Sequence, residues 1–244
     1  STHIRNLYFW QKANNFVDNC VVLVTGAGSG IGQAVSLIYA QRSCRLIVTD
    51  YNKQALNNTY NKIIKLRQEK KIDQSVLSIP CDVTSELQVK ELMQQSIKHY
   101  HGIDILILCA GIGAHNKFST TNNLDIFNKC MNVNFYGYLY CSKYAYKTLI
   151  DSYQRISQKG ILAAITSFSG EVGLPYRTAY CASKFAVTGF LESLRSELAL
   201  NKENQQFDIV IICPPSVNTN LRKNSITHDN TLKEKGKDIK KSMN

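Results

Sequence analysis

The chain has 244 residues, of which 44% are hydrophobic and 19% charged. These values are ordinary for a soluble folded protein, and the length fits one α/β domain. No apolar run reaches the roughly 18 residues of a membrane span, and no secretory signal is visible. The formal net charge of +11 raises the question of a nucleic-acid or anionic-membrane partner. The basic residues are spread along the chain, however, and their densest run, 233–241, is interspersed with acids. We therefore expect no nucleic-acid partner.

Eight cysteines and five histidines are scattered without a Cys-x-x-Cys pair or any other ligand pattern. Buried thiols in a reducing compartment explain this better than disulfides or a metal site, so we expect an intracellular, cytoplasmic protein without metal. Residues 1–19 contain an apolar knot, Leu7–Trp10, which fits a short helix or a membrane interface. The chain opens on Ser1 rather than Met, so endoplasmic reticulum membrane association stays open if an anchor has been lost.

From residue 20 onward, short apolar runs alternate with amphipathic stretches. The runs predict buried strands at 20–24, 45–50, 75–79, 103–108, 160–166 and 207–212. Helices are expected from the glycine-rich turn to about 42, and at 52–71, 85–100, 124–153 (broken near Gly137) and 177–202. This alternation predicts a three-layer α/β/α Rossmann fold with a mostly or fully parallel sheet. We expect a nucleotide-binding catalytic domain at 20–219, preceded by an extension and followed by a substrate lid and basic tail at 220–244.

A glycine-rich turn, Thr25–Gly32, stands directly after the first strand and opens a helix. Glycines permit positive φ and close backbone approach, and a helix N-terminus presents free N–H groups to an anion. This context predicts a dinucleotide site. Its residues are Gly26, Ser29, Gly30, Ile31 and Gly32.

Asp50 ends the second predicted strand, 18 residues after Gly32, where a carboxylate can accept both hydroxyls of an adenosine ribose. Its charge would repel a 2′-phosphate, and neither Ser29 nor Tyr51 is basic, so NAD is preferred while NADP stays open. A helix-capping role for Asp50 is the structural alternative. Asp82 and Val83 follow the third strand and would meet the adenine edge, although Asp82 equally suits a turn.

Tyr180 and Lys184 are four residues apart, so on a helix both side chains lie on one face. An ammonium beside a phenol lowers a pKa that is otherwise about 10. A tyrosine with a lowered pKa can act as an acid or base near neutral pH. An amphipathic helix with a solvated lysine gives the same spacing, so other residues must decide.

The glycine turn, Ala110-Gly111, Asn134, Ser167 and the Tyr180/Lys184 pair together resemble the short-chain dehydrogenase/reductase family, over about residues 18–220. Ser167 lies 13 residues before Tyr180, as in the family's serine segment. Asn134 matches the family's asparagine motif, and Pro214 begins a segment that resembles its Pro-Gly segment.

The resemblance implies a role for each residue. Tyr180 would be the general acid or base, and Ser167 would hydrogen-bond the same substrate oxygen. Lys184 would lower the proton affinity of Tyr180 and bind the nicotinamide ribose, and Asn134 would hold a water of a proton relay. The coenzyme would also contact Ala110, Gly111, Pro214, Val217 and Thr219.

Three departures from the family pattern stand out. Cys109 replaces an asparagine, which puts the stability of the sheet near the adenine in doubt. Pro215 replaces a glycine, which stiffens the loop over the nicotinamide and removes an N–H. No apolar run for the family's usual seventh strand follows Thr219.

The function expected is hydride transfer between a nicotinamide coenzyme and a small-molecule alcohol or ketone. Alternatives are an NADPH-dependent lipid or steroid ketone reductase and a non-catalytic NAD(H)-binding module. Residues 172–178 are expected to line the pocket mouth, and a Gly-Leu-Pro followed by arginine there is common among relatives acting on steroids, retinoids and lipid-like ketones. The family's usual pairing of helices implies a homodimer or homotetramer, through a face that carries Cys181, Phe185, Thr188 and Glu192.

Overall fold

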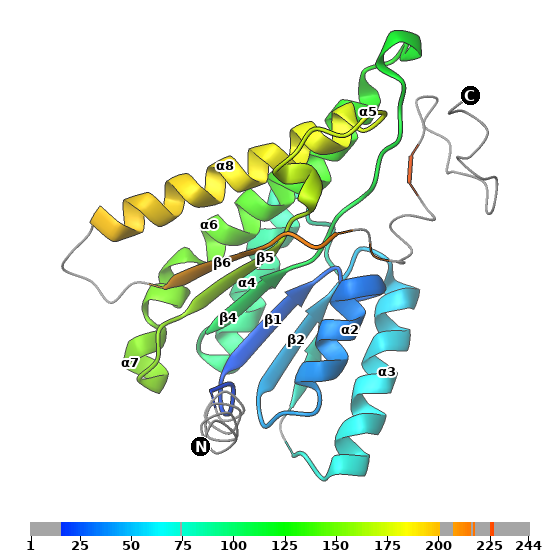
Figure 1. The fold of residues 1–244 in the computed structure, drawn as a ribbon. Coiled ribbons are helices and arrows are strands. Elements are labelled where there is room, and N and C mark those ends of the chain that lie inside the picture. The colour runs from blue at the N-terminus through cyan, green and yellow to red at the C-terminus, as the bar shows by residue number, and fades with distance from the viewer. Residues whose placement is uncertain (1–15, 74, 201–206, 216, 218–224, 227–244) are drawn as a thin grey trace, which may run out of the picture.

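A computed structural model describes residues 16–73, 75–200, 207–215, 217 and 225–226. In this part of the chain, strands and helices alternate (Figure 1). The strands form one parallel sheet in the order β3-β2-β1-β4-β5-β6. They are β1 (Val21–Thr25), β2 (Arg45–Thr49), β3 (Val76–Ser78), β4 (Ile105–Leu108), β5 (Ile161–Ile165) and β6 (Asp208–Ile212).

Helices cover both faces of the sheet, with α2 and α3 on one side and α4, α6 and α8 on the other (Figure 1). The helices are α2 (Gly30–Tyr39), α3 (Lys53–Lys70), α4 (Glu86–Tyr100), α5 (Asp125–Cys130), α6 (Gly137–Ile150), α7 (Ser152–Ile156) and α8 (Thr178–Leu200). Short 3-10 turns lie at Phe118–Thr120 and Phe168–Gly170. The predicted three-layer parallel fold is confirmed.

The unbroken apolar strands follow from burial on both faces. Val21 and Leu23 of β1 pack in the core shared with α4, α6 and α8, whereas Val22 and Val24 pack in the core under α2 and α3. Because successive side chains of a strand alternate between faces, every position of such a strand has to be apolar.

The helix expected at 124–153 is divided in the structure. A π-helix, Met131–Tyr136, separates α5 from α6, and α7 follows α6 as a separate short helix. Gly137 begins α6 against Val83, since a Cβ on this glycine would lie 2.8 Å from Val83 Cγ2. A π-helix has i→i+5 hydrogen bonds and is frequent at functional sites. The expected break lies next to Gly137, and it takes the form of a change in helix type.

All eight cysteines are thiols, six of them buried and two half-buried. None of the helices in the described ranges combines the length and the apolar character that crossing a bilayer requires. On α8, Cys181 is buried within the chain while Phe185 is 45% exposed. The face expected for subunit pairing is therefore partly covered by the chain's own core, and oligomerisation through it stays a prediction.

Candidate active site

The glycine turn lies where the strand order reverses, between β1 and β4. Gly26 has φ +65°, and a Cβ there would lie 2.7 Å from the Ala110 Cα. A Cβ on Gly32 would lie 2.2 Å from the Gly26 carbonyl oxygen. The turn therefore has no room for side chains at these two positions, and its backbone is free to approach a ligand closely.

Helix α2 begins directly after this turn. Ser29, its N-cap residue, makes no side-chain capping hydrogen bond, and the first turn contains no acidic residue. Its first N–H groups are therefore not capped by a side chain, and the positive end of the helix dipole faces the turn. This geometry suits a pyrophosphate, so the residues present fit a dinucleotide.

Asp50 follows β2 and lies against the glycine turn. Its Oδ2 accepts a hydrogen bond from the Gly28 N–H at 2.9 Å, and its Oδ1 accepts one from the Asn52 N–H at 2.9 Å. The cap of α3 is Asn52, whose side chain accepts from the Ala55 N–H at 3.0 Å. Asn52, and not Asp50, therefore caps α3. The carboxylate of Asp50 lies against the glycine turn, at the Gly28 N–H.

The carboxylate of Asp82 is engaged in a local turn. Its Oδ1 accepts hydrogen bonds from the N–H and the hydroxyl of Thr84, both at 2.9 Å. Val83 is buried in the core against α6. Of the two interpretations of Asp82, the structure shows the turn, and contact between this segment and an adenine stays a prediction.

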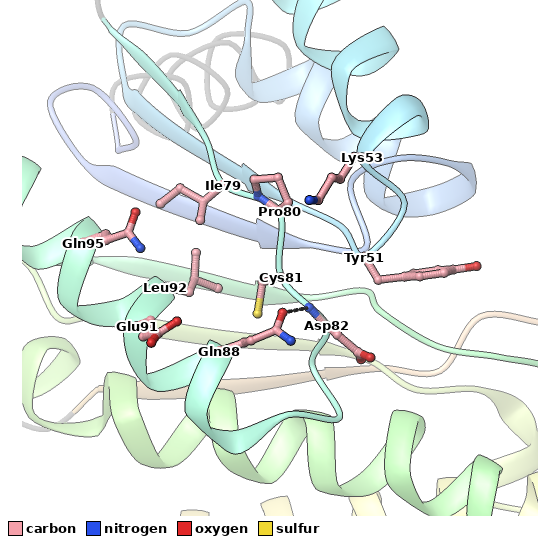
Figure 2. A pocket seen from close by; sticks show the side chains of 10 residues that line it. All are labelled: Tyr51, Lys53, Ile79, Pro80, Cys81, Asp82, Gln88, Glu91, Leu92 and Gln95. Carbon is pink, nitrogen blue, oxygen red and sulfur yellow. Dashed lines mark hydrogen bonds between the residues drawn. The ribbon is translucent and has the colours of Figure 1, made fainter.

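A cavity of about 640 Å³ lies beside this segment, at the open edge of β3. Figure 2 shows the chain 79–82 crossing it, with Lys53 on one side and side chains of α4 on the other. The Asp82 N–H donates to Gln88 Oε1 at 3.0 Å across its wall. Tyr51, next to Asp50, also lines the cavity, which therefore adjoins the predicted adenosine end of the site.

The connection after β4 is joined to β1 by one hydroxyl. Thr25 Oγ1 accepts from the Cys109 N–H at 3.1 Å and from the Ala110 N–H at 3.2 Å. The weakening expected from Cys109 in place of an asparagine is therefore absent at these two N–H groups, because a threonine hydroxyl on the neighbouring strand satisfies them. Ala110 and Gly111 lie half-buried beside the glycine turn.

Asn134 is fully buried in the π-helix. Its Oδ1 accepts from the Ile112 N–H at 2.8 Å, and its Nδ2 donates to the Ile112 carbonyl at 3.1 Å and to Ser183 Oγ at 2.9 Å. Ser183 in turn donates to the Tyr180 carbonyl at 2.8 Å. Both amide N–H groups are thus used within the protein, and the side chain holds the loop after β4 to α8. A relay water at Asn134 stays a prediction.

Ser167 follows β5 and Tyr180 lies on the first turn of α8. The Ser167 hydroxyl accepts from the Ser169 N–H at 3.1 Å, and its interaction with the Tyr180 phenol lowers the pKa of that phenol. The two hydroxyl groups are therefore close enough to share one substrate oxygen, which is what the resemblance implies for them.

Lys184 is 2% exposed and lies one turn further along α8. Its Nζ is 5.8 Å from the centroid of the Tyr180 ring and donates to the Ile165 carbonyl at 3.3 Å. The ammonium thus lies within cation–π range of the phenol ring rather than out in solvent.

Burial dominates the proton affinities of this pair. It raises the pKa of the Tyr180 phenol, while the hydrogen bond with Ser167 and the charge of Arg177 lower it. Burial lowers the pKa of Lys184 to about 8, against nearby thiols that raise it. A lowered phenol pKa was expected from Lys184. The phenol pKa is raised instead, because burial destabilises the phenolate more than Ser167 and Arg177 stabilise it.

The segment after β6 also lies at the carboxyl ends of the strands. The Pro214 carbonyl accepts from the Phe168 N–H at 3.2 Å, which aligns the segment with the one that carries Ser167. Val217 is 41% exposed, and Thr219 lies outside the described residues. Contacts of these residues with a coenzyme stay predictions.

The family model for short chain dehydrogenases matches residues 20–230. The chain belongs to the short-chain dehydrogenase family. This confirms the resemblance, and it makes the chain a member of an oxidoreductase family that uses nicotinamide coenzymes.

Curated relatives of this short-chain dehydrogenase include "Dehydrogenase/reductase SDR family protein 7-like" of Dictyostelium discoideum, which is 29% identical over 93% of this chain and 68% of its own length. Another is "11-beta-hydroxysteroid dehydrogenase-like 3" of Arabidopsis thaliana, 31% identical over 89% of this chain and 63% of its own length. The chain thus spans about two thirds of the length of these relatives.

Solved structures share the fold. A short chain dehydrogenase/reductase from Burkholderia phymatum in complex with NAD has a TM-score of 0.74 at 24% identity, covering 84% of this chain and 68% of that one. A 7α-hydroxysteroid dehydrogenase complexed with NADH and 7-oxo glycochenodeoxycholic acid also has a TM-score of 0.74, at 23% identity, covering 87% and 77%.

Two residues that support the site of this short-chain dehydrogenase were not singled out from the sequence. The Tyr138 hydroxyl lies 2.8 Å from the Leu108 carbonyl oxygen and 2.7 Å from that of Ile165, and its ring is 5.3 Å from Lys184 Nζ. It fixes the ends of β4 and β5 beneath the lysine. Ser183, the link between Asn134 and α8, is the second. Neither has a sequence signal, since a tyrosine in an apolar helix and a serine on α8 suit ordinary packing equally well.

Proposed function

We propose that this chain is an NAD-dependent oxidoreductase that transfers a hydride between the coenzyme and an alcohol or ketone. The observation that carries the proposal is the buried Tyr180 phenol, whose pKa Ser167 lowers and whose ring has the Lys184 ammonium 5.8 Å from its centroid. This group lies at the carboxyl ends of the strands, as the glycine turn does. A module that only bound NAD would need the turn and Asp50, but not a buried lysine beside a tyrosine.

The proposed mechanism assigns the proton to Tyr180. A bound nicotinamide would supply the hydride, or accept it in the reverse direction. During reduction, the Tyr180 hydroxyl donates its proton to the carbonyl oxygen as the new C–H bond forms, and Ser167 hydrogen-bonds the same oxygen. The phenolate left behind is stabilised by the Lys184 ammonium until a proton from solvent restores the phenol.

The pKa of Lys184 supports this role. With a pKa of about 8, the amine is mainly protonated at neutral pH and close to the point at which it can exchange its proton. The phenol pKa is raised by burial, so Tyr180 rests as the neutral acid that carbonyl reduction requires. The phenolate exists only while the proton is on the substrate.

NAD is the proposed coenzyme because of Asp50. Its carboxylate stands at the mouth of the glycine turn, where a negative charge favours ribose hydroxyls and opposes a 2′-phosphate. The competing proposal is an NADPH-linked reductase of lipid or steroid ketones. Relatives named as hydroxysteroid dehydrogenases favour that substrate class, but not that coenzyme.

Hydride transfer can be tested with NADH and NADPH deuterated at the transferring carbon, incubated with the purified chain and a panel of ketones. We expect deuterium on the carbinol carbon of the product, with faster transfer from NADH. Tight NADH binding without label transfer to any ketone would instead identify a binding module. A strong preference for NADPH would overturn the assignment of Asp50.

A further inference from the structure

Arg177 is a second cation beside Tyr180 that the proposed mechanism does not use. It immediately precedes α8 and is half-buried, and its Cζ lies 5.7 Å from the centroid of the Tyr180 ring. Lys184 Nζ lies 5.8 Å from the same centroid. The phenol therefore has two cations within about 6 Å of its ring, and Lys184 alone accounts for stabilising the phenolate.

Among the residues that the structure describes, the Arg177 guanidinium has no hydrogen-bond acceptor. In the described ranges, no ion pair or side-chain hydrogen bond involves it, and its one recorded contact is the Tyr180 ring. Arg155, by contrast, donates to the Asp104 carboxylate at 2.8 Å and to two carbonyl oxygens. A guanidinium has five N–H donors, and a partly buried one without an acceptor is missing partners that an anion would supply.

The surroundings of Arg177 add positive potential instead of balancing it. The N-terminus of α8 carries the positive end of the helix dipole, and the first turn contains no acidic residue. The positive end of the helix dipole repels the Arg177 cation, whereas helix N-termini usually carry Asp or Glu.

Backbone contacts hold Arg177 in a defined place. It forms a parallel bridge with Asn116, whose N–H donates to the Tyr176 carbonyl at 2.9 Å. Asn116 Nδ2 donates to Thr178 Oγ1 at 2.9 Å, while its buried Oδ1 has no partner in the part of the chain that the structure describes. The bridge thus holds the backbone of Arg177 in place. The Asn116 Oδ1 is an acceptor, so it would pair with a hydroxyl of a ligand and not with its anionic group.

We propose that Arg177 binds an anionic group of the substrate, so that this chain acts on oxo- or hydroxy-compounds bearing a carboxylate or a phosphate near the reacting carbon. This inference rests on the proposed function. A bidentate pair with the guanidinium would orient the carbonyl toward Tyr180 and Ser167. A neutral steroid or lipid ketone would leave Arg177 without an acceptor, and it would forgo this orientation.

Matched pairs of ketones test the inference. Acetoacetate and levulinate would be compared with their methyl esters, and dihydroxyacetone phosphate with dihydroxyacetone, by NADH oxidation. We expect kcat/KM to favour the charged member of at least one pair by roughly 10- to 100-fold, the range for a hydrogen bond to a charged group. Preference confined to the carboxylates or to the phosphate identifies the anion.

Substitution at Arg177 separates anion binding from a general loss. Arg177→Met should remove the preference for the charged member, chiefly through KM, and Arg177→Lys should restore part of it. Lys129→Met removes an equal charge from an exposed position on α5 and should leave the preference unchanged. An equal preference in wild type and Arg177→Met would overturn the inference while leaving the proposed function intact.

If none of these ketones is turned over, the proposed function is in question, and anion binding is then measured directly. Calorimetric titration of the NADH-loaded chain with acetate and with inorganic phosphate gives the answer. Binding that Arg177→Met abolishes supports the anion site. The absence of binding by either anion overturns it.

Discussion

The two ends of the candidate site differ in whether backbone or side-chain groups form them. At the proposed coenzyme end, the groups that would recognise the coenzyme are the backbone of the turn at Gly26–Gly32 and of the N-terminus of α2, together with the carboxylate of Asp50. At the proposed catalytic end, the groups are the buried side chains of Tyr180 and Lys184, whose pKa values are shifted. The first end requires glycines, because a Cβ at Gly26 or Gly32 would clash with neighbouring backbone. The second end requires two particular side chains, a phenol and an amine.

This difference predicts how each end responds to substitution. A backbone site fails when the chain can no longer adopt its shape, so binding and stability should fall together. A site of buried titratable groups already opposes folding, so there function should fall while stability holds or rises.

Tyr180→Phe should have the largest effect on turnover. It removes the hydroxyl and leaves the ring in its packing, so we expect turnover to fall by roughly 10²- to 10⁴-fold, the usual contribution of a general acid. NADH binding, followed by quenching of coenzyme fluorescence, should be unchanged. Retained turnover would contradict the proposed mechanism.

Lys184→Met should separate activity from stability. We expect little residual turnover together with an increase in the free energy of unfolding of about 1 to 3 kcal/mol, because the shift from 10.5 to about 8 reports the cost of burying the charge. Chemical denaturation at neutral pH measures it.

The pH dependence of stability gives the matching control. Because the folded pKa of Lys184 is lowered, the unfolded chain binds more protons between pH 8 and 10.5, and the contribution of Lys184 to stability rises with pH in that window. The advantage of Lys184→Met over wild type should therefore shrink as pH rises through it. A constant difference would show that burial of the charge is not its cause.

Gly26→Ala should lower stability and NADH affinity together. The residue has φ +65°, and its new Cβ would meet the Ala110 backbone at 2.7 Å. We expect a loss of about 1 to 3 kcal/mol in the free energy of unfolding, as for other residues forced into a sparsely populated conformation. Gly173→Ala, with nothing within 4 Å of its Cβ, is the control.

Asp50→Asn should have the smallest effect. It removes the charge and keeps an acceptor, so we expect the ratio of NADPH to NADH affinity to rise about fivefold, corresponding to about 1 kcal/mol of like-charge repulsion in water. The affinity for NADH itself should change less. An unchanged ratio would mean that Asp50 serves only to hold the Gly28 N–H.

The fold was predictable because its causes are local. Short apolar runs within 45–50 and 103–108 predicted buried strands, and their alternation with helices predicted a parallel sheet. The glycine turn and the four residues Asn134, Ser167, Tyr180 and Lys184 were likewise visible in the sequence. The structure places the glycine turn and Ser167 at the carboxyl ends of the parallel strands.

What the sequence did not reveal depends on contacts between distant segments. Local helix preference does not distinguish α-helical from π-helical bonding, so the π-helix at Met131–Tyr136 was missed. The direction of the Tyr180 pKa shift depends on burial by other elements. Similarly, the sequence could not show that Arg177 lacks an acceptor among the described residues, because any acidic residue in the sequence could have supplied one.

One carboxamide, that of Asn134, fastens three segments: its own π-helix, the loop at Ile112 and α8 through Ser183. The loop follows β4 beside the glycine turn, and α8 carries Tyr180. Asn134 therefore links the segment beside the proposed coenzyme turn to the helix that carries the proposed acid. The exchange of a single atom, as in Asn134→Asp, would set an oxygen against the Ile112 carbonyl and uncouple the two. In the proposed mechanism, Asn134 would thus couple coenzyme docking to the placement of Tyr180.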